Sequence, residues 1–559
     1  SCQEEYTNPL NRRYHAQPVS CNSCGPRLSH EIEAIAKDIK SGKIVAIKGL
    51  GGFHIVCDAT NSEIIDKLRE FKNRPTKPFA IMCKDLEQVA NLASVGEVEK
   101  ELLESKEAPI VILKKLDTLN ISKSIAPNID RLGCFLPYTA LHHILFRYLS
   151  NPILATSANL GSEPIIIDAK DIASKLPFVD TIVDFNRDII NGVDDSLVQV
   201  IGSNIQTLRL SRGYAPRVIK LPFKSEKRIL AVGANAKNSI AFVIEDNIIL
   251  SPHIGDLDSL KAFEFFTRTI ETFKRFYDFE PDVIVHDKHP NYETTKWAKK
   301  QNKELMEVQH HLAHIYACKA EFGLSGEYLG FSFDGTGYGD DSTLWGGEVF
   351  VGNERKYSFK AIKLLGGEKA IKEPRRVALS MLFDKFSIDE VLVLDIELVK
   401  SFSPSEIKLL HQSHSKNLNA PLSSSVGRIF DAVASFSNLL QFQSYEGEAG
   451  LICEQNYNKN ITRVFEYRVV DGIIDIEFDF FDKELVSVFI NTLVKIVLDI
   501  AKIEKLEVIL SGGVFQNKTL LELIINTLEN ENIKYYHQYD TAINDGGIAL
   551  GQAYFLLTH

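Results

Sequence analysis

The stretch Tyr328–Gly337, which reads Tyr-Leu-Gly-Phe-Ser-Phe-Asp-Gly-Thr-Gly, decides how the second half of this chain is expected to fold. Its apolar run predicts a strand, and the small residues that follow predict a tight turn. An earlier stretch, Ile229–Gly233, has the same plan and leads through a turn with Lys and Asn into further strand-like sequence. We therefore predict a domain over residues 228–559 that is built from two similar α/β lobes, at about 228–327 and 328–559.

Between these two stretches, Val308–His314 reads Val-Gln-His-His-Leu-Ala-His and predicts a metal site. On a helix, residues four apart share a face, so His310 and His314 would point the same way and could hold one metal ion. A structural role is the competing interpretation, because most isolated histidine pairs on helices do not bind metal. Later turns of small residues suit a nucleotide phosphate, and together with the histidines they indicate an enzyme that handles nucleotides. These turns are Asp334–Gly337, Ser511–Gly513 and Asn544–Gly547.

Composition places the chain among ordinary globular proteins of several domains. At 559 residues it is too long for one core, and 45% of its residues are hydrophobic and 25% charged. The net charge of −11 argues against a broad nucleic-acid-binding surface. No apolar run is long enough to cross a bilayer and no signal peptide opens the sequence, so the cytoplasm is the expected compartment and no membrane partner is expected.

Cysteines near the start of the chain predict a partial zinc site. Cys2, Cys21 and Cys24 have the spacing of three of the four ligands in a C-x2-C-x18-C-x2-C zinc module, whose missing ligand would precede Ser1. A lone CxxC turn without metal is the alternative. The remaining cysteines lie scattered in apolar sequence, which favours reduced core residues over a disulfide framework.

Residues 28–223 alternate helical and strand-like segments and predict a single α/β domain, joined to the second half by the charged segment Lys224–Arg228. Nine residues within it hold four cations, and two prolines keep this segment out of a helix. Clustered cations on a constrained loop suit a triphosphate, although a solvated charged loop is the common alternative. Hydroxyl and amide side chains after a later strand favour nucleotide binding. The cations are Arg69, Lys72, Arg74 and Lys77, and the polar residues are Thr156, Ser157 and Asn159.

Taken in order, these motifs resemble the hydrogenase maturation carbamoyltransferase family HypF nearly from end to end. The segment Tyr6–Pro18 with Cys21 and Cys24 is similar to the family's second zinc finger. Other segments resemble its YrdC-like domain and its actin-like transferase domain. Those of the first kind are Lys72–Met82, Leu136–Thr139, Thr156–Asn159 and Arg212–Pro216, and those of the second are His253–Leu257, His310–His314, Asp334–Gly339, Leu510–Asn517 and Asn544–Gly551.

The resemblance implies a multidomain α/β fold. A partial C4-type zinc finger over residues 1–27 would precede a YrdC-like α/β domain over 28–223. An actin-like (ASKHA) two-lobed transferase domain over 228–559 would follow. The strand, small-residue turn and further strands seen twice in the second half are how the two halves of an actin-like fold begin.

The resemblance also implies a function. Enzymes of this family turn carbamoyl phosphate and ATP into carbamoyl-adenylate in the YrdC-like domain. The actin-like domain then passes the carbamoyl group to the C-terminal Cys of the partner HypE, for synthesis of the cyanide ligands of NiFe hydrogenases. The implied cofactors are ATP with Mg, zinc in the knuckle, and a transition metal, Fe or Zn, at the histidines.

Each candidate residue has a role under this resemblance. Lys72, Arg74 and Lys77 would neutralise phosphate charge, and Thr156, Ser157 and Asn159 would hold the nucleotide. His310 and His314 would ligate the metal together with Asp334 and Asp545, because mixed nitrogen and oxygen ligands suit iron, zinc or manganese better than calcium. A further set would contact phosphate and sugar, with the glycines admitting close backbone approach. That set is Gly335, Thr336, Gly512, Gly513, Asn517 and Gly546.

Two departures from the family pattern matter. Gln199 stands where the family often has Arg, which removes a cation from the neighbourhood of the first site. The family also begins with an acylphosphatase-like domain and another zinc finger, which this sequence does not include. We therefore expect the chain to adenylate and transfer, but to use carbamoyl phosphate poorly until the upstream domain is supplied.

Two other functions compete with this interpretation. An enzyme that O-carbamoylates a small molecule could share the two core domains, but the zinc-finger remnant favours a role in a larger assembly. A tRNA-modifying or RNA-binding protein of the YrdC type is the second alternative. The acidic net charge and the lack of an aromatic and basic stripe disfavour it.

Overall fold

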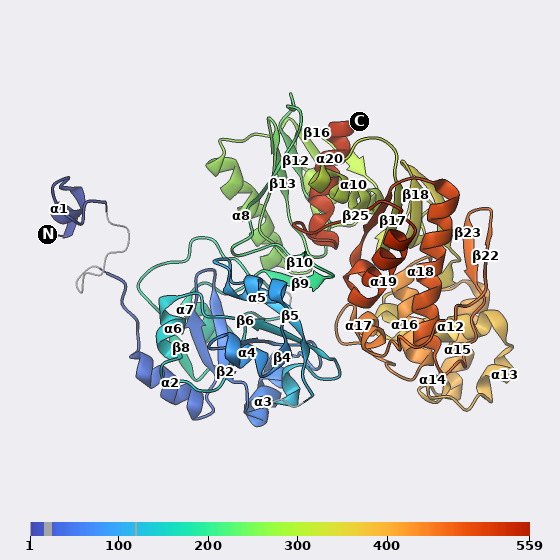
Figure 1. Ribbon diagram of the computed structural model, residues 1–559, viewed down its shortest axis with the longest axis horizontal. Coiled ribbons are helices and arrows are strands. Elements are labelled where there is room, and N and C mark those ends of the chain that lie inside the picture. The colour runs from blue at the N-terminus through green and yellow to red at the C-terminus, as the bar shows by residue number, and fades with distance from the viewer. Residues whose placement is uncertain (1, 16–24, 118–119, 162) are drawn as a thin grey trace. The chain divides into compact units, whose positions relative to one another are not determined.

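The computed structural model describes residues 2–15, 25–117, 120–161 and 163–559, which form two compact units (Figure 1). Most of the chain before Ser196 belongs to the first unit and the rest to the second. Residues 196–223, expected in the first α/β domain, therefore pack with the second unit, and so do the short segments Pro75–Lys77 and Pro127–Arg131. The expected domain boundaries stay a prediction.

The N-terminal region begins with helix α1 (Cys2–Thr7). Cys2, the first predicted zinc ligand, is its first residue. Cys21 and Cys24 lie outside the described residues, so the zinc knuckle stays a prediction.

The first unit is built on a mixed sheet in which β1 pairs antiparallel with β2 and parallel with β8. The strand order is β5-β6-β3-β7-β2-β1-β8, with β4 paired to β5. Helices α2 and α6 pack together on one face, where Ile35, Ala36 and Ile39 of α2 are buried against strand residues such as Val45. Their spacing puts all three on one side of the helix, which is why this amphipathic segment covers the sheet. The strands are β1 (Val45–Lys48), β2 (Phe53–Asp58), β3 (Ala80–Met82), β4 (Ala93–Ser94), β5 (Ile110–Lys115), β6 (Arg131–Phe135), β7 (Ile153–Ser157) and β8 (Thr181–Val183). The helices are α2 (Ile32–Lys40), α3 (Ser62–Phe71), α4 (Leu86–Ala90), α5 (Glu97–Glu104), α6 (Ala140–Leu145) and α7 (Ala169–Lys175).

The second unit contains two sheets whose inner strands repeat one topology. In one, β12 pairs antiparallel with β13 and parallel with β15; in the other, β17 pairs antiparallel with β18 and parallel with β24. The strand orders are β11-β14-β13-β12-β15-β16 and β22-β23-β19-β18-β17-β24-β25. Both predicted stretches, Ile229–Gly233 and Tyr328–Gly337, begin at the first strand of a repeat. The first sheet comprises β11 (Arg217–Lys220), β12 (Ile229–Ala231), β13 (Ala241–Ile244), β14 (Asn247–Leu250), β15 (Val283–Asp287) and β16 (Glu304–Val308). The second comprises β17 (Leu329–Tyr338), β18 (Leu344–Val351), β19 (Glu354–Phe359), β20 (Ile362–Lys363), β21 (Leu422–Ser423), β22 (Tyr467–Val470), β23 (Ile473–Ile476), β24 (Val508–Ser511) and β25 (Tyr535–His537).

Helices surround these sheets, and the large core behind the second sheet is formed mainly by α12, α16, α18 and α19 (Figure 1). A β-hairpin of β9 (Leu197–Ile201) and β10 (Asn204–Arg209) precedes the first sheet. The helices are α8 (Leu260–Phe276), α9 (Glu293–Ala298), α10 (His310–Phe322), α11 (Glu368–Lys372), α12 (Pro374–Lys385), α13 (Ile388–Leu392), α14 (Glu397–Lys400), α15 (Pro404–Lys416), α16 (Val426–Phe436), α17 (Glu448–Gln455), α18 (Leu485–Glu504), α19 (Lys518–Asn530) and α20 (Ile548–Thr558).

The last helix, α20, crosses back to the first sheet of this unit. Its residues Leu550 and Tyr554 are buried in one cluster with Ala231 and Val285 of that sheet. It also packs directly on α10, and a Cβ on Gly551 would lie 1.7 Å from the carbonyl oxygen of Ala313. Glycine is therefore required where the two helices meet. The expected division into lobes at residue 328 does not include this return of the chain.

Among the described residues, no helix is both long and apolar enough to span a membrane.

Candidate functional site

Four side chains of the second unit converge on one buried point. His310 and His314 come from the first turns of α10, Asp334 from the middle of β17, and Asp545 from the 3-10 turn Asp545–Gly547 before α20. The Nε2 atom of His310 lies 3.6 Å from Asp334 Oδ2 and 3.9 Å from Asp545 Oδ1, and the corresponding distances for His314 are 3.8 and 3.7 Å. The structure thus brings together all four residues predicted to ligate the metal.

The chemistry of this four-ligand cluster fits a metal ion. Bonds of about 2.0–2.2 Å to nitrogen and oxygen would place tetrahedral ligand atoms about 3.4 Å apart, close to the spacing found here. The Nε2 atoms of His310 and His314 are buried and make no hydrogen bond within the described chain. Burial and the carboxylate of Asp334 raise the pKa of Asp545. A cation between the two carboxylates would relieve their repulsion and occupy both imidazole lone pairs.

Asp287, which the sequence did not predict, orients one of the two histidines that are predicted to bind a metal. Its Oδ2 atom lies 2.8 Å from His310 Nδ1, and both side chains are fully buried. Burial disfavours the charged imidazole, but the carboxylate of Asp287, with those of Asp334 and Asp545, outweighs burial and raises the pKa of His310. With a proton on Nδ1, His310 presents the Nε2 lone pair to the cluster. The available signal was an aspartate at the carboxyl end of the apolar strand β15.

A bulge in β17 presents Asp334 to the cluster. The register between β17 and β18 shifts between Phe333 and Gly337, so the intervening residues turn out of the ladder. A Cβ on Gly337 would lie 2.5 Å from the ring of His311. Glycine there lets the strand approach α10 closely, which is a structural reason for part of the small-residue motif.

In the other small-residue turns, some of the predicted phosphate contacts border the cluster, whereas others are needed by the fold itself. Gly513 N donates to Asp334 Oδ1 over 3.2 Å, whereas a Cβ on Gly512 would lie 2.3 Å from the carbonyl oxygen of Phe333. Asn517 caps α19 by accepting from Leu520 N and donates to Gly450 O. Gly512 and Asn517 therefore have structural duties. The remaining predicted contacts, Gly335 and Thr336 in the β17 bulge and Gly546 next to Asp545, border the cluster.

The first unit brings Lys72 to the predicted nucleotide turn. Lys72 Nζ donates to the carbonyl oxygens of Ser157 and Asn159 and to Asn159 Oδ1, each over 3.0 Å. Burial, together with the nearby charge of Arg74, lowers the pKa of Lys72 to about 7. Asn159 is fixed in turn, because its Nδ2 atom donates to Glu163 O over 2.9 Å. Thr156 and Ser157 end strand β7 beside this group.

The four cations of the predicted triphosphate loop differ in their surroundings. Arg69 is buried and donates to the carbonyl oxygens of Ser124, Arg74 and Ile125, so it fixes the loop. Arg74 donates to Pro78 O and lies over the ring of Phe79. Lys77 packs with the second unit and is not placed with Lys72. Its phosphate contact stays a prediction.

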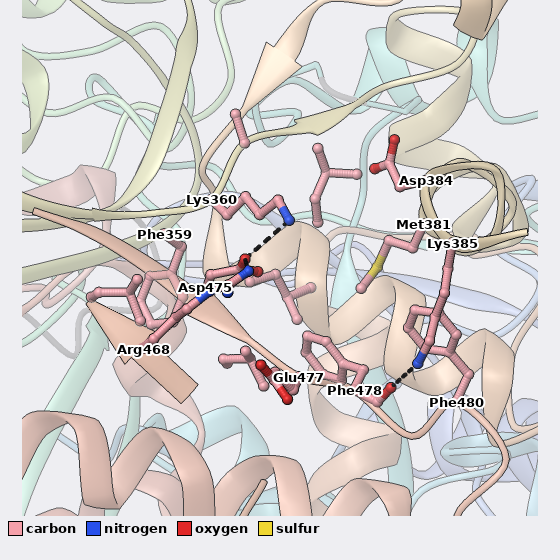
Figure 2. A pocket seen from close by; sticks show the side chains of 15 residues that line it. Phe359, Lys360, Met381, Asp384, Lys385, Arg468, Asp475, Glu477, Phe478 and Phe480 are labelled. Carbon is pink, nitrogen blue, oxygen red and sulfur yellow. Dashed lines mark hydrogen bonds and ion pairs between the residues drawn. The ribbon is translucent and has the colours of Figure 1, made fainter. Parts of the chain in front are cut away.

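A cavity of about 320 Å³ lies elsewhere in the second unit, beside β19, β23 and α12 (Figure 2). Its floor is apolar and its rim is charged. The cations on the rim have partners, since Lys360 and Arg468 both pair with Asp475, and Lys385 donates to Phe478 O. None of the predicted site residues lines it.

Family models match most of the chain in four successive segments. Residues 1–30 match the HypF finger and residues 37–211 match the Sua5/YciO/YrdC model described as telomere recombination. Residues 224–321 match the HypF Kae1-like domain, and residues 330–552 match the second subdomain of the carbamoyltransferase Kae1-like domain.

Curated proteins and solved structures agree with these matches. The chain is 38% identical to the carbamoyltransferase HypF of Synechocystis sp. over 92% of its own length and 71% of that protein, and 34% identical to that of Rhodobacter capsulatus over 99% and 78%. A crystal structure of full-length HypF in the phosphate- and nucleotide-bound form matches with a TM-score of 0.93 and 36% identity, covering 100% of this chain and 78% of that one. The T. kodakarensis HypF structure matches with a TM-score of 0.91 and 32% identity, over 99% and 78%. These matches confirm the predicted fold class, a YrdC-like α/β domain followed by an actin-like two-lobed transferase domain, for which the matching models are Kae1-like.

Proposed function

Because the chain belongs to the carbamoyltransferase HypF family, we propose that it activates a carbamoyl group with ATP and transfers it to a protein thiol during the maturation of NiFe hydrogenases. The observation that carries the proposal is the buried four-ligand cluster of His310, His314, Asp334 and Asp545. It supports a transfer site in the second unit, separate from the Lys72 group in the first.

The first reaction would occur in the YrdC-like part of the chain. Hydrolysis of carbamoyl phosphate releases phosphate and leaves carbamate. A carbamate oxygen then attacks the α-phosphorus of ATP, a new P–O bond forms, and the bond to pyrophosphate breaks. Lys72 and Arg74 would stabilise the negative charge on the leaving pyrophosphate, and Lys77 would join them. Thr156, Ser157 and Asn159 would position the nucleotide, and Mg would accompany ATP.

The second reaction would occur at the four-ligand cluster. The C-terminal Cys thiolate of HypE attacks the carbamoyl carbon, a C–S bond forms, and the C–O bond to the adenylate phosphate breaks, with AMP taking the electron pair. An iron or zinc ion held by the cluster would supply Lewis acidity to the phosphate and carbamoyl oxygens. Asp287 keeps His310 oriented, and the backbone around Gly335, Thr336 and Gly513 can approach the phosphate closely.

A structural zinc ion completes the proposal. Cys2, Cys21 and Cys24 would be its ligands in the N-terminal finger, and thiolate ligands suit zinc. We place the enzyme in the cytoplasm, where ATP and carbamoyl phosphate are available.

Mass spectrometry of the acceptor tests the proposed function. The chain is incubated with ATP, carbamoyl phosphate and purified HypE, with and without an added acylphosphatase domain of the family. The expected result is one carbamoyl group on the C-terminal Cys of HypE, and a HypE variant with Ser at that position should stay unmodified. An unmodified wild-type HypE under both conditions would refute the proposal.

A further inference from the structure

Two cations approach the four-ligand cluster of the second unit from different segments of the chain, and the proposed function has given neither a role. Lys237 lies in the turn between β12 and β13, and Arg428 lies in the first turn of α16. A Cβ on Gly335 would lie 3.6 Å from Arg428 Nη2, which places the guanidinium beside the β17 bulge. The carbonyl oxygen of Lys237 lies 3.6 Å from where a Cβ on Gly546 would be, next to Asp545.

Arg428 is buried without a full set of hydrogen bonds. Its side chain is about 5% exposed, and its Nε and Nη1 atoms make no hydrogen bond to any described residue. Nη1 lies 2.5 Å from Asp431 Oδ2, but the two groups are not aligned for a hydrogen bond. A buried guanidinium with unused donors is costly unless something binds it, and its planar donors suit a phosphate. Nη2 of the same guanidinium lies beside Gly335, so an anion at the β17 bulge would be within reach of this group.

Lys237 is held in an unusual backbone conformation that aims it at the same place. Its φ of 46° lies in the left-handed region, which non-glycine residues seldom adopt. Asp256 stabilises the turn by accepting from Lys237 N over 2.8 Å, which accounts for part of the His253–Leu257 motif. Such strain at a site that also carries charge suggests that the position of the lysine matters for binding.

The carboxylate of Glu446 lies beside Lys237 and the β17 bulge, where a ligand phosphate would bind. Its Oε2 atom lies 2.6 Å from Lys237 Nζ, and its Oε1 atom lies 3.9 Å from where a Cβ on Gly335 would be. The glutamate is therefore close to both the lysine and the bulge. Its side chain is 62% exposed, so it can swing into solvent at small cost.

We propose that Lys237 and Arg428 bind the phosphate of the acyl-nucleotide ligand beside the four-ligand cluster, and that Glu446 is an internal counter-ion which this phosphate displaces. The proposal rests on the proposed function, because it assumes a nucleotide at that cluster. It adds the two residues that recognise the phosphate and a carboxylate that competes with it.

Paramagnetic relaxation separates this site from the nucleotide site of the first unit. The full chain is loaded with Mn²⁺, and relaxation of the H8 proton is titrated with AMP and with adenosine, which lacks the phosphate. Only a nucleoside bound near the metal is relaxed strongly. His314→Ala, which removes one of the metal ligands, should abolish the effect and so provides the background.

The three residues should change AMP binding in opposite directions. Lys237→Gln should weaken AMP about tenfold or more and leave adenosine unchanged, because a charge-assisted contact is lost. Arg428→Met should do the same. Glu446→Gln should strengthen AMP binding several-fold, because the competing anion is removed. Lys227→Gln and Glu304→Gln alter a surface ion pair of similar length, 2.9 Å, and should change nothing.

The outcomes separate this inference from the proposed function. If neither AMP nor adenosine is relaxed in the wild-type chain, the nucleotide site at the cluster and this inference both fail. If AMP is relaxed but Glu446→Gln binds it no better, or Lys237→Gln weakens adenosine equally, only the inference is overturned. Lys237→Gln and Glu446→Gln change less buried side chains and keep the inference testable even if Arg428→Met folds poorly.

Discussion

Lys72 in the first unit and Lys237 in the second are both half-buried lysines at proposed phosphate sites, yet their surroundings differ. Lys72 donates to two carbonyl oxygens and an amide oxygen, and burial lowers its pKa to about 7. Lys237 donates to the carboxylate of Glu446. Burial opposes its charge, but the carboxylates of Glu446 and Asp545 outweigh burial and raise the pKa of Lys237.

The difference indicates how the charge of each lysine is balanced before a ligand binds. The hydrogen-bond acceptors of Lys72 are neutral, so an incoming polyanion adds negative charge and favours the ammonium form. The second site already contains an anion, so a ligand phosphate has to replace it. We expect Lys72 in the first site to take up a proton when the ligand binds. In the second site we expect the ligand phosphate to displace the carboxylate of Glu446 from Lys237.

The largest effect is expected from a substitution that disables the proposed transfer site in the second unit. His314→Ala should lower carbamoyl transfer to HypE about 10³-fold, since loss of the metal removes several kcal/mol of charge stabilisation. ATP–pyrophosphate exchange should persist, because the Lys72 group is untouched. The control His411→Ala lies on α15, outside both sites. Equal loss of both activities would mean that the two sites are not independent.

A substitution in the proposed nucleotide site of the first unit should instead impair pyrophosphate exchange and spare the transfer step. Lys72→Ala should slow pyrophosphate exchange about 10²- to 10³-fold, because a positioned charge at the leaving group is lost. Synthetic carbamoyl-adenylate, added directly, should restore transfer to HypE. Lys67→Ala, which breaks a surface ion pair with Glu63 on the same helix, provides the matched control. Failure of the added adenylate to rescue transfer would contradict separate sites.

A smaller effect is expected from the residue that orients His310. Asp287→Asn should weaken metal binding about 10- to 100-fold, as for other carboxylates that support a histidine ligand. A chelator competition with Zn²⁺ measures the affinity directly. Asp282→Asn, at an exposed residue directly before the same strand, should leave it unchanged. Unaltered zinc affinity in Asp287→Asn would remove Asp287 from the site.

The smallest effect tests the titration of Lys72. ATP raises the pKa of a neighbouring lysine, so binding at pH 8, above the free value of about 7, should take up close to one proton. Below about pH 6 the lysine is already charged and the uptake should vanish. Calorimetry in two buffers of different ionisation enthalpy measures it. Lys72→Arg keeps its charge at both pH values, so residue 72 should then contribute no proton uptake. If the uptake is unchanged in this variant, the proton binds to another group.

The four residues predicted to ligate a metal do lie together, but local spacing accounts for only two of them. Helical periodicity alone pairs His310 with His314, whereas Asp334 and Asp545 were predicted through the family resemblance of the turns that contain them. The duplicated sheet was also predictable, because each half opens on an apolar run and a glycine turn.

Residues that act through long-range contacts could not be found in this way. Asp287, Lys237, Arg428 and Glu446 lie in four separate segments, and only packing of those segments brings them to the cluster. Arg69 was grouped with the phosphate-binding cations, but its carbonyl partners make it structural. A charge pattern shows which side chains are cationic. It does not show which of them already donate hydrogen bonds to other parts of the protein.

The contact between Gly551 of α20 and Ala313 of α10 links the proposed metal site to the order of synthesis. The histidines on α10 leave the ribosome long before Asp545, which directly precedes α20. Until α20 is made, the apolar face of the first sheet lacks one of its covering helices and the histidines lack a carboxylate. We therefore expect the proposed metal site to be complete only after Asp545 and α20 have been made.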